Sequence, residues 1–293
     1  MEHSQLCLSV ITINKKATNK LKVLIPTDFS DEANNAVHYA IDFLSKRKAD
    51  LYFLNTFISP HGGSGMLISI DQILAKDSSK ELNKLKRRLE HKNAFEGLTY
   101  NVISESGYLE SAIDKFNQIH RFDLIIMGTK VESGFSGALF GSTASKVIAQ
   151  SKIPVLTIPE PVKFEGINTV LLTTDGKPFN NSMVVTLIKK MVESYPDSLQ
   201  VIHVETPLSK TKLESIKTNI ASLGKSLNID DQKLLRTSGE SFVEGIDQYL
   251  SDNKVDMLLM VPRKASFLEK FMNISDTRDV THQIKIPLWT FRD

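Results

Sequence analysis

The chain lacks the residues on which several protein classes depend. Only one of its 293 residues is cysteine, Cys7, which excludes an intrachain disulfide and a cysteine-based metal cluster. No apolar run approaches the roughly 20 residues of a membrane-spanning helix. Residues 1–20 lack the basic start and the small-residue cleavage pattern of a signal peptide, so we interpret them as an N-terminal extension. These absences favour a cytoplasmic protein that makes no contact with a membrane.

An excess of charge and the common catalytic motifs are lacking too. The 36 basic and 34 acidic residues leave a net charge of +2, which gives no reason to expect nucleic acid as a partner. The histidines are dispersed, without the short-spaced pair of a zinc motif. No Gly-Lys-Ser/Thr follows a glycine loop, and no Gly-x-Ser-x-Gly elbow surrounds Ser142. We therefore predict no metal site and assign no catalytic residue.

The chain does contain short apolar runs that alternate with amphipathic helical patterns. Ser30 is a favourable N-cap for a helix whose apolar residues recur at spacings of three and four. The strands expected in the first half are Leu21–Pro26, Leu51–Phe57, Leu98–Ser104, Leu124–Met127 and Ile153–Ile158. Strands that alternate with helices predict an α/β fold: an open, mainly parallel, Rossmann-like sheet with helices on both faces.

The pattern occurs twice. A constant shift of 133 residues lays the apolar run at Leu124 on the run at Met257 without a gap. This repeat predicts two copies of one α/β unit, each with a five-stranded sheet. The predicted domains are residues 21–160 and residues 166–293. We expect the final strands, around Val155–Ile158 and Leu288–Phe291, to meet as an intrachain pseudo-dimer. Association of two chains into a homodimer stays open.

The end of the first unit predicts an anion site. The apolar run Leu124–Met127 is followed by a loop with small residues, and a helical pattern then begins at Gly141-Ser142-Thr143. The first N–H groups of a helix have no partner inside it and point outward with the positive end of the helix dipole, which suits a phosphate. Open parallel sheets bind ligands beyond the carboxyl ends of their strands. We therefore predict a phosphate-containing ligand in the first half.

Together these features resemble the universal stress protein A family in its tandem two-domain form. The resemblance is carried by the strand end Pro26-Thr27-Asp28-Phe29-Ser30, by the final Ile153-Pro154-Val155 and by the glycine loop. The family's phosphate motif is a glycine, two residues, a glycine, nine residues, a glycine, and then Ser or Thr. In this chain the motif falls on Gly128, Val131, Gly141 and Ser142. The fold that the resemblance implies is the adenine nucleotide alpha hydrolase-like form of the Rossmann-like class.

The resemblance also implies a ligand and a set of contacts. It implies that the first domain alone binds ATP, ADP or AMP, with or without Mg²⁺, and at most hydrolyses ATP slowly. It places Thr27 and Asp28 beside the adenosine and Thr56 in the base or ribose pocket. The remaining implied contacts are Met127, Gly128, Lys130, Val131, Gly141, Ser142 and Thr143. Val131 stands where the family has a glycine, and β-branched residues resist a positive φ, so weak or phosphate-poor binding is the alternative.

The second half departs further from the motif. The same shift places Val261 on Gly128 and Ile274 on Gly141. The loop Arg263–Asn273 carries large apolar side chains in place of small ones: Phe267, Leu268, Phe271 and Met272. A backbone that carries such side chains cannot wrap a triphosphate. We therefore predict a degenerate second domain that binds no nucleotide.

Alternatives remain open for single residues and for the whole chain. Asp28 and Asp175, each of which follows a strand, could simply cap the next turn. His203 ends a strand without an evident partner and is typical of a structural histidine. The chain as a whole could be an interaction scaffold that binds no nucleotide and acts through dimerisation. A nucleotidyl-transfer enzyme is disfavoured because the chain has neither a His-x-Gly-His nor a Ser-Gly-Gly-x-Asp-Ser stretch.

Overall fold

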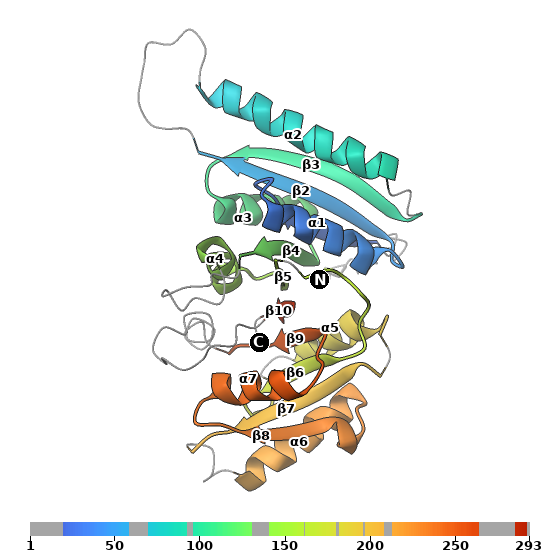
Figure 1. Ribbon diagram of the computed structural model, residues 1–293, viewed down its shortest axis with the longest axis vertical. Coiled ribbons are helices and arrows are strands. Elements are labelled where there is room, and N and C mark those ends of the chain that lie inside the picture. The colour runs from blue at the N-terminus through green and yellow to red at the C-terminus, as the bar shows by residue number, and fades with distance from the viewer. Residues whose placement is uncertain are drawn as a thin grey trace, which may run out of the picture.

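A single ten-stranded sheet runs through the centre of the protein (Figure 1). The computed structural model describes residues 20–58, 70–92, 96–130, 141–160, 162–179, 182–195, 197–207, 213–263 and 285–291. In spatial order the strands are β3 (Leu98–Ser106), β2 (Ala49–Phe57), β1 (Leu21–Pro26), β4 (Leu124–Thr129), β5 (Val155–Pro159), β10 (Leu288–Thr290), β9 (Met257–Met260), β6 (Val170–Thr174), β7 (Leu199–Glu205) and β8 (Leu234–Ser238). The predicted α/β class is confirmed, but the two five-stranded units are joined edge to edge in one sheet.

Helices cover both faces of this sheet. They are α1 (Asp31–Leu44), α2 (Ile70–Lys92), α3 (Leu109–His120), α4 (Ser142–Gln150), α5 (Ser182–Val192), α6 (Leu213–Leu227) and α7 (Phe242–Asp252), with a short 3₁₀ helix η2 (Asp231–Lys233). Buried side chains of α1, α2, α5 and α6 form one apolar layer with the sheet. Those of α3, α4 and α7 form the other. Each layer continues across both halves of the molecule, so the core is shared.

Helix α1 begins where the sequence places its N-cap. The hydroxyl of Ser30 accepts a hydrogen bond from Ala33 N at 3.2 Å, and acidic residues follow in the first turn. Its buried face includes Ala33, Ala36 and Ala40, whose small side chains let the helix pack closely on β4 and β5. The start of α1 is therefore held beside the carboxyl end of β4.

The register of the strands confirms the 133-residue repeat. In the first half Ile126 of β4 pairs with Leu156 of β5, and in the second half Leu259 of β9 pairs with Trp289 of β10. Each residue of the second pair is 133 positions beyond its counterpart. Both halves also have the same strand order, with the first strand of each unit between its second and fourth strands. The domain boundaries drawn in the sequence stay a prediction.

The two halves join through β5 and β10, which are antiparallel and lie at the middle of the sheet (Figure 1). Leu156 faces Trp289, its own counterpart in the repeat. The hydroxyl of Thr157 donates to Leu288 O at 3.2 Å, and that of Thr290 donates to Val155 O at 3.3 Å. These bonds are equivalent under the same shift, so the join has local two-fold symmetry. The final strands meet, as the sequence predicted.

An aromatic cluster reinforces the join on one face. The ring of Phe43 in α1 lies 5.9 Å from that of Tyr195 and 5.9 Å from that of Trp289, so the first half contacts the second through rings. Arg47 extends this contact, because its guanidinium donates to Ser194 Oγ at 3.0 Å and to Met191 O at 3.1 Å. Burial lowers the pKa of Arg47 and raises that of Tyr195.

Trp289 offers a test of this join. We expect Trp289→Ala to lower the free energy of unfolding by about 3–5 kcal/mol, because it leaves a cavity between the two halves. Trp289→Phe should cost much less, since the indole nitrogen is buried without a hydrogen-bond partner in the described part of the chain and its removal costs nothing in bonding. Urea unfolding followed by circular dichroism measures both. Equal losses for the two variants would contradict the packing described here.

Candidate functional site

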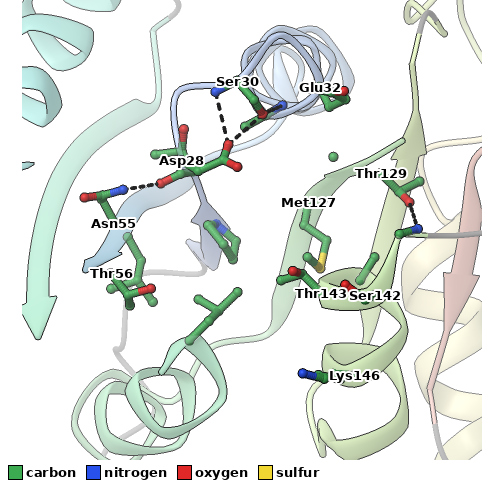
Figure 2. A pocket seen from close by; sticks show the side chains of 18 of the residues that line it. Asp28, Ser30, Glu32, Asn55, Thr56, Met127, Thr129, Ser142, Thr143 and Lys146 are labelled. Atoms are coloured by element: carbon green, nitrogen blue, oxygen red, sulfur yellow. Dashed lines mark hydrogen bonds between the residues drawn. The ribbon is translucent and has the colours of Figure 1, made fainter. Parts of the chain in front are cut away.

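A cavity of about 690 Å³ opens at the carboxyl ends of β1, β2 and β4, between the N-termini of α3 and α4. Nine of the ten residues predicted to form the site line it: Thr27, Asp28, Thr56, Met127, Gly128, Lys130, Gly141, Ser142 and Thr143. The tenth, Val131, lies outside the described residues. Figure 2 shows Asp28 and Thr56 on one side of the cavity and Met127, Ser142 and Thr143 on the other.

The turn after β1 is held by its own side chains. The hydroxyl of Thr27 accepts from Phe29 N at 3.1 Å, and Asn55 donates to Thr27 O at 2.7 Å. Asp28 Oδ1 accepts from Ser30 N at 3.1 Å and from Ser30 Oγ at 2.6 Å (Figure 2). Asp28 thus caps the turn, as one alternative for this residue proposed. Both bonds go to one oxygen of an exposed carboxylate, so capping and ligand contact are compatible.

The N-terminus of α4 faces open space. Among the described residues, no atom lies within 4 Å of a Cβ added at Gly141, and no side chain caps the helix. Gly141 N donates to the hydroxyl of Thr129 at 3.2 Å, which fixes the helix start to the end of β4 (Figure 2). Ser142 and Thr143 are exposed beside it. The first turn therefore presents its N–H groups, two hydroxyls and the positive end of its dipole to the cavity.

Gly128 has a different reason to be glycine. The sequence predicted that the strand ends at Met127 and that a loop follows, but the structure places Gly128 inside β4. A Cβ on this residue would lie 2.3 Å from Glu32 O in the first turn of α1, a distance that real Cβ atoms do not reach. Gly128 is therefore required by the close packing of α1 on β4. Its role in the cavity is to let β4 and the start of α1, which both line the cavity, pack against each other.

Several lining residues were not predicted from the sequence. They are Ser30, Glu32, Asn55, Ile58, Tyr108, Glu110, Thr129 and Lys146, among others. Lys146 is exposed and lies one turn beyond Ser142 on α4, a spacing from which it could have been found. Lys130 Nζ lies 3.9 Å from Glu32 Oε1, so the carboxylate offsets part of the positive charge of the lysine. Tyr108 and Glu110 belong to the start of α3, which only the fold brings to the cavity.

The second half repeats the turn, and an arginine of the same half lies against its aspartate. Thr174 accepts from Gly176 N at 3.1 Å, and Asp175 Oδ1 accepts from Lys177 N at 3.0 Å, as in the first half. The other oxygen of Asp175 lies 3.2 Å from Arg263 Nε. The predicted apolar loop side chains lie outside the described residues. The aspartate of the second half is thus bound to an arginine of its own chain.

His203 proves to have a partner. Its Nδ1 lies 2.9 Å from Thr174 O, the same contact that Asn55 makes with Thr27 in the first half. The bond requires a hydrogen on Nδ1, because a carbonyl oxygen only accepts. His203 therefore ties β7 to the end of β6, which agrees with the structural role expected from the sequence.

Comparison with known proteins identifies the family. A model of the universal stress protein family matches residues 21–159. A universal stress protein of Methanocaldococcus jannaschii is 32% identical over 154 residues, which cover 48% of this chain and 84% of that protein. The chain belongs to the universal stress protein family. A second universal stress protein of the same organism is 26% identical over 151 residues, 47% of this chain and 93% of that protein.

A solved structure extends the likeness to both halves. The universal stress protein of Archaeoglobus fulgidus has a TM-score of 0.66 and covers 94% of this chain and 99% of its own. The identity is 18%, so this likeness shows the fold alone. It agrees with a tandem member of the universal stress protein family, in which two similar halves form one chain.

The described part of the chain lacks two further features. None of the helices there combines the length and the hydropathy that crossing a membrane requires. Nor do the described histidine, cysteine, aspartate and glutamate side chains gather in threes that could hold a metal ion.

The two cavity glycines should respond differently to an added methyl group. We expect Gly128→Ala to lower the free energy of unfolding by about 1–3 kcal/mol or more, because the new Cβ overlaps the Glu32 carbonyl. Gly141→Ala should change it by less than about 1 kcal/mol, since its φ of −56° suits any residue and no described atom lies within 4 Å of the new Cβ. Thermal unfolding measures both variants. A stable Gly128→Ala protein would contradict the packing of α1 on β4.

Proposed function

We propose that the cavity of the first half binds an adenine nucleotide, ATP, ADP or AMP, and that the protein acts as a nucleotide-responsive regulator in the stress response. The observation that carries the proposal is the open N-terminus of α4 at Gly141, which faces a cavity of about 690 Å³. That volume lies within the range of ligand pockets. Helix N-termini of this kind bind phosphate groups. Membership of the universal stress protein family is consistent with this ligand.

The polarity of the cavity orients the nucleotide. Ser142, Thr143 and Lys146 lie on the α4 side, where hydroxyls, backbone N–H groups and a lysine suit the phosphates (Figure 2). Asp28 and Thr56 lie on the β1–β2 side, where a carboxylate suits the ribose hydroxyls. The nucleotide would span the cavity from the end of β2 to the start of α4.

The cavity supplies few groups for a metal or for catalysis. Its carboxylates are Asp28, Glu32 and Glu110, and its lining has no histidine or cysteine among the described residues. Mg²⁺ would therefore enter with the phosphates of the nucleotide, which commonly supply its ligands. We assign no residue to the activation of a water molecule, so the role proposed is binding.

We propose that the second half, residues 166–293, binds no nucleotide. Arg263 forms an ion pair with Asp175, the counterpart of Asp28. The side chain of Ile216 packs directly against the turn, since a Cβ at Gly176 would lie 2.7 Å from it. The symmetric join of β5 and β10 supports a structural role for this half as an intrachain partner. Its pairing with the first half would imitate a dimer of two single-unit relatives.

Calorimetry with purified full-length protein tests the proposal. ATP should bind with a stoichiometry of one per chain, and the midpoint of thermal unfolding should rise with ATP concentration because ligand binds only the folded state. The absence of both heat and a thermal shift at millimolar ATP would overturn the proposal. In that case the chain would be better described as an interaction scaffold.

The paired aspartates provide a matched control. We expect Asp28→Asn to lower the affinity for ATP by about tenfold, the effect of losing a hydrogen bond to a charged acceptor. Asp175→Asn should leave the affinity unchanged, because Asp175 is bonded to Arg263. Asparagine still accepts the turn hydrogen bonds, so the test isolates the charge. An unchanged affinity in Asp28→Asn would mean that Asp28 only caps the turn.

A further inference from the structure

Two exposed apolar side chains lie at the rim of the cavity. Tyr108 is 68% exposed and Ile58 is 55% exposed, and both line the cavity. Only four large hydrophobic residues in the described part of the chain are exposed, and the other two, Ile73 and Ile119, do not line it. A single exposed hydrophobic residue is ordinary, but two that share one rim mark a contact surface.

The fold brings these two residues together. Gly107 N donates to Phe57 O at 2.8 Å, so the chain just beyond β2 runs beside the chain just beyond β3. Ile58 follows Phe57, and Tyr108 follows Gly107. The pairing of β2 with β3 extends to this point, since Phe57 faces Ser106. The position of Tyr108 is therefore set by the sheet and by a backbone bond.

Local structure gives no reason for a tyrosine at this position. Tyr108 is the N-cap residue of α3, where Ser, Thr, Asp and Asn are preferred, and its side chain makes no capping bond. The side chain contributes little to the core, because most of it is exposed. What it does is add an aromatic ring to the rim of the cavity, on the side away from the N-terminus of α4.

We propose that Tyr108, supported by Ile58, binds the base of the nucleotide through its ring and so determines that the site takes a nucleotide in preference to a bare polyphosphate. The inference rests on the proposed function and adds its specificity. An aromatic ring stacks on any base, whereas the groups at the start of α4 recognise phosphate alone. The two ends of the cavity thus recognise the two ends of the ligand.

Titration calorimetry of the full-length protein with ATP and with inorganic triphosphate tests this division. Tyr108→Ala should lower the affinity for ATP by about tenfold, the lower range for loss of one base stacking contact, and leave triphosphate binding unchanged. Tyr108→Phe keeps the ring and should bind both ligands as the unsubstituted protein does. Ile119→Ala, on the same helix but outside the cavity lining, is the control and should change neither affinity; Ile119 is 64% exposed.

The outcomes separate this inference from the function on which it rests. If the unsubstituted protein binds ATP and Tyr108→Ala binds it equally well, the inference is overturned and the nucleotide site stands. Equal losses for ATP and triphosphate would overturn it too, because the defect would then be structural. If the unsubstituted protein binds neither ligand, the proposed function fails and this inference fails with it.

A fluorescence variant keeps the test independent of the stability of Tyr108→Ala. Tyr108→Trp introduces an exposed indole into a protein whose single tryptophan, Trp289, is buried. Saturating ATP should quench the new emission, because the base stacks on the ring, and inorganic triphosphate should not. Emission that ATP leaves unchanged at saturation would overturn the inference.

Discussion

The close approach of α1 to β4 at Gly128 is the contact on which the site depends. Because a Cβ there would overlap Glu32 O, the strand residue has to lack a side chain for the helix to start where it does. That start lies five residues after the end of β1, and the short turn between them carries Thr27 and Asp28. The turn is thereby held across the cavity from Gly141, at the start of α4. The packing of Gly128 against α1 thus determines where Thr27 and Asp28 lie in the cavity.

The second half lacks that contact, although it keeps the hydrogen bonds of the turn. Val261 stands at the position of Gly128 in the repeat and packs against the core. Helix α5 begins at Ser182, eight residues after the end of β6, so the connection is longer. Arg263 then lies within bonding distance of Asp175, at a turn that otherwise keeps the geometry of its counterpart. The backbone of the repeat is retained, while its cavity chemistry is not.

Sequence periodicity located the five strands of the first half to within two residues at each end. The strand Leu21–Pro26 and the cap at Ser30 were predicted to the residue, because local patterns determine both. The gap-free repeat anticipated the join of β5 with β10. One feature was out of reach. The packing role of Gly128 depends on a helix about 100 residues earlier in the chain, which no local pattern reveals.

The site residues that are neighbours in the sequence were predictable. Those that come from distant parts of the chain were not. Gly141, Ser142 and Thr143 are consecutive, so a helix start in the sequence identifies them. Tyr108 and Ile58 are 50 positions apart in the chain and meet only because β2 pairs with β3. The specificity that we propose for the cavity therefore comes from the part that spacing alone does not reveal.

A crystal structure of the full-length protein with a non-hydrolysable ATP analogue tests the central claim most directly. We predict one nucleotide per chain, with its phosphates at Gly141 and Ser142 and its base against Tyr108, and with Arg263 still bonded to Asp175. Density in the second half, or an empty first half at saturating ligand, would contradict this assignment.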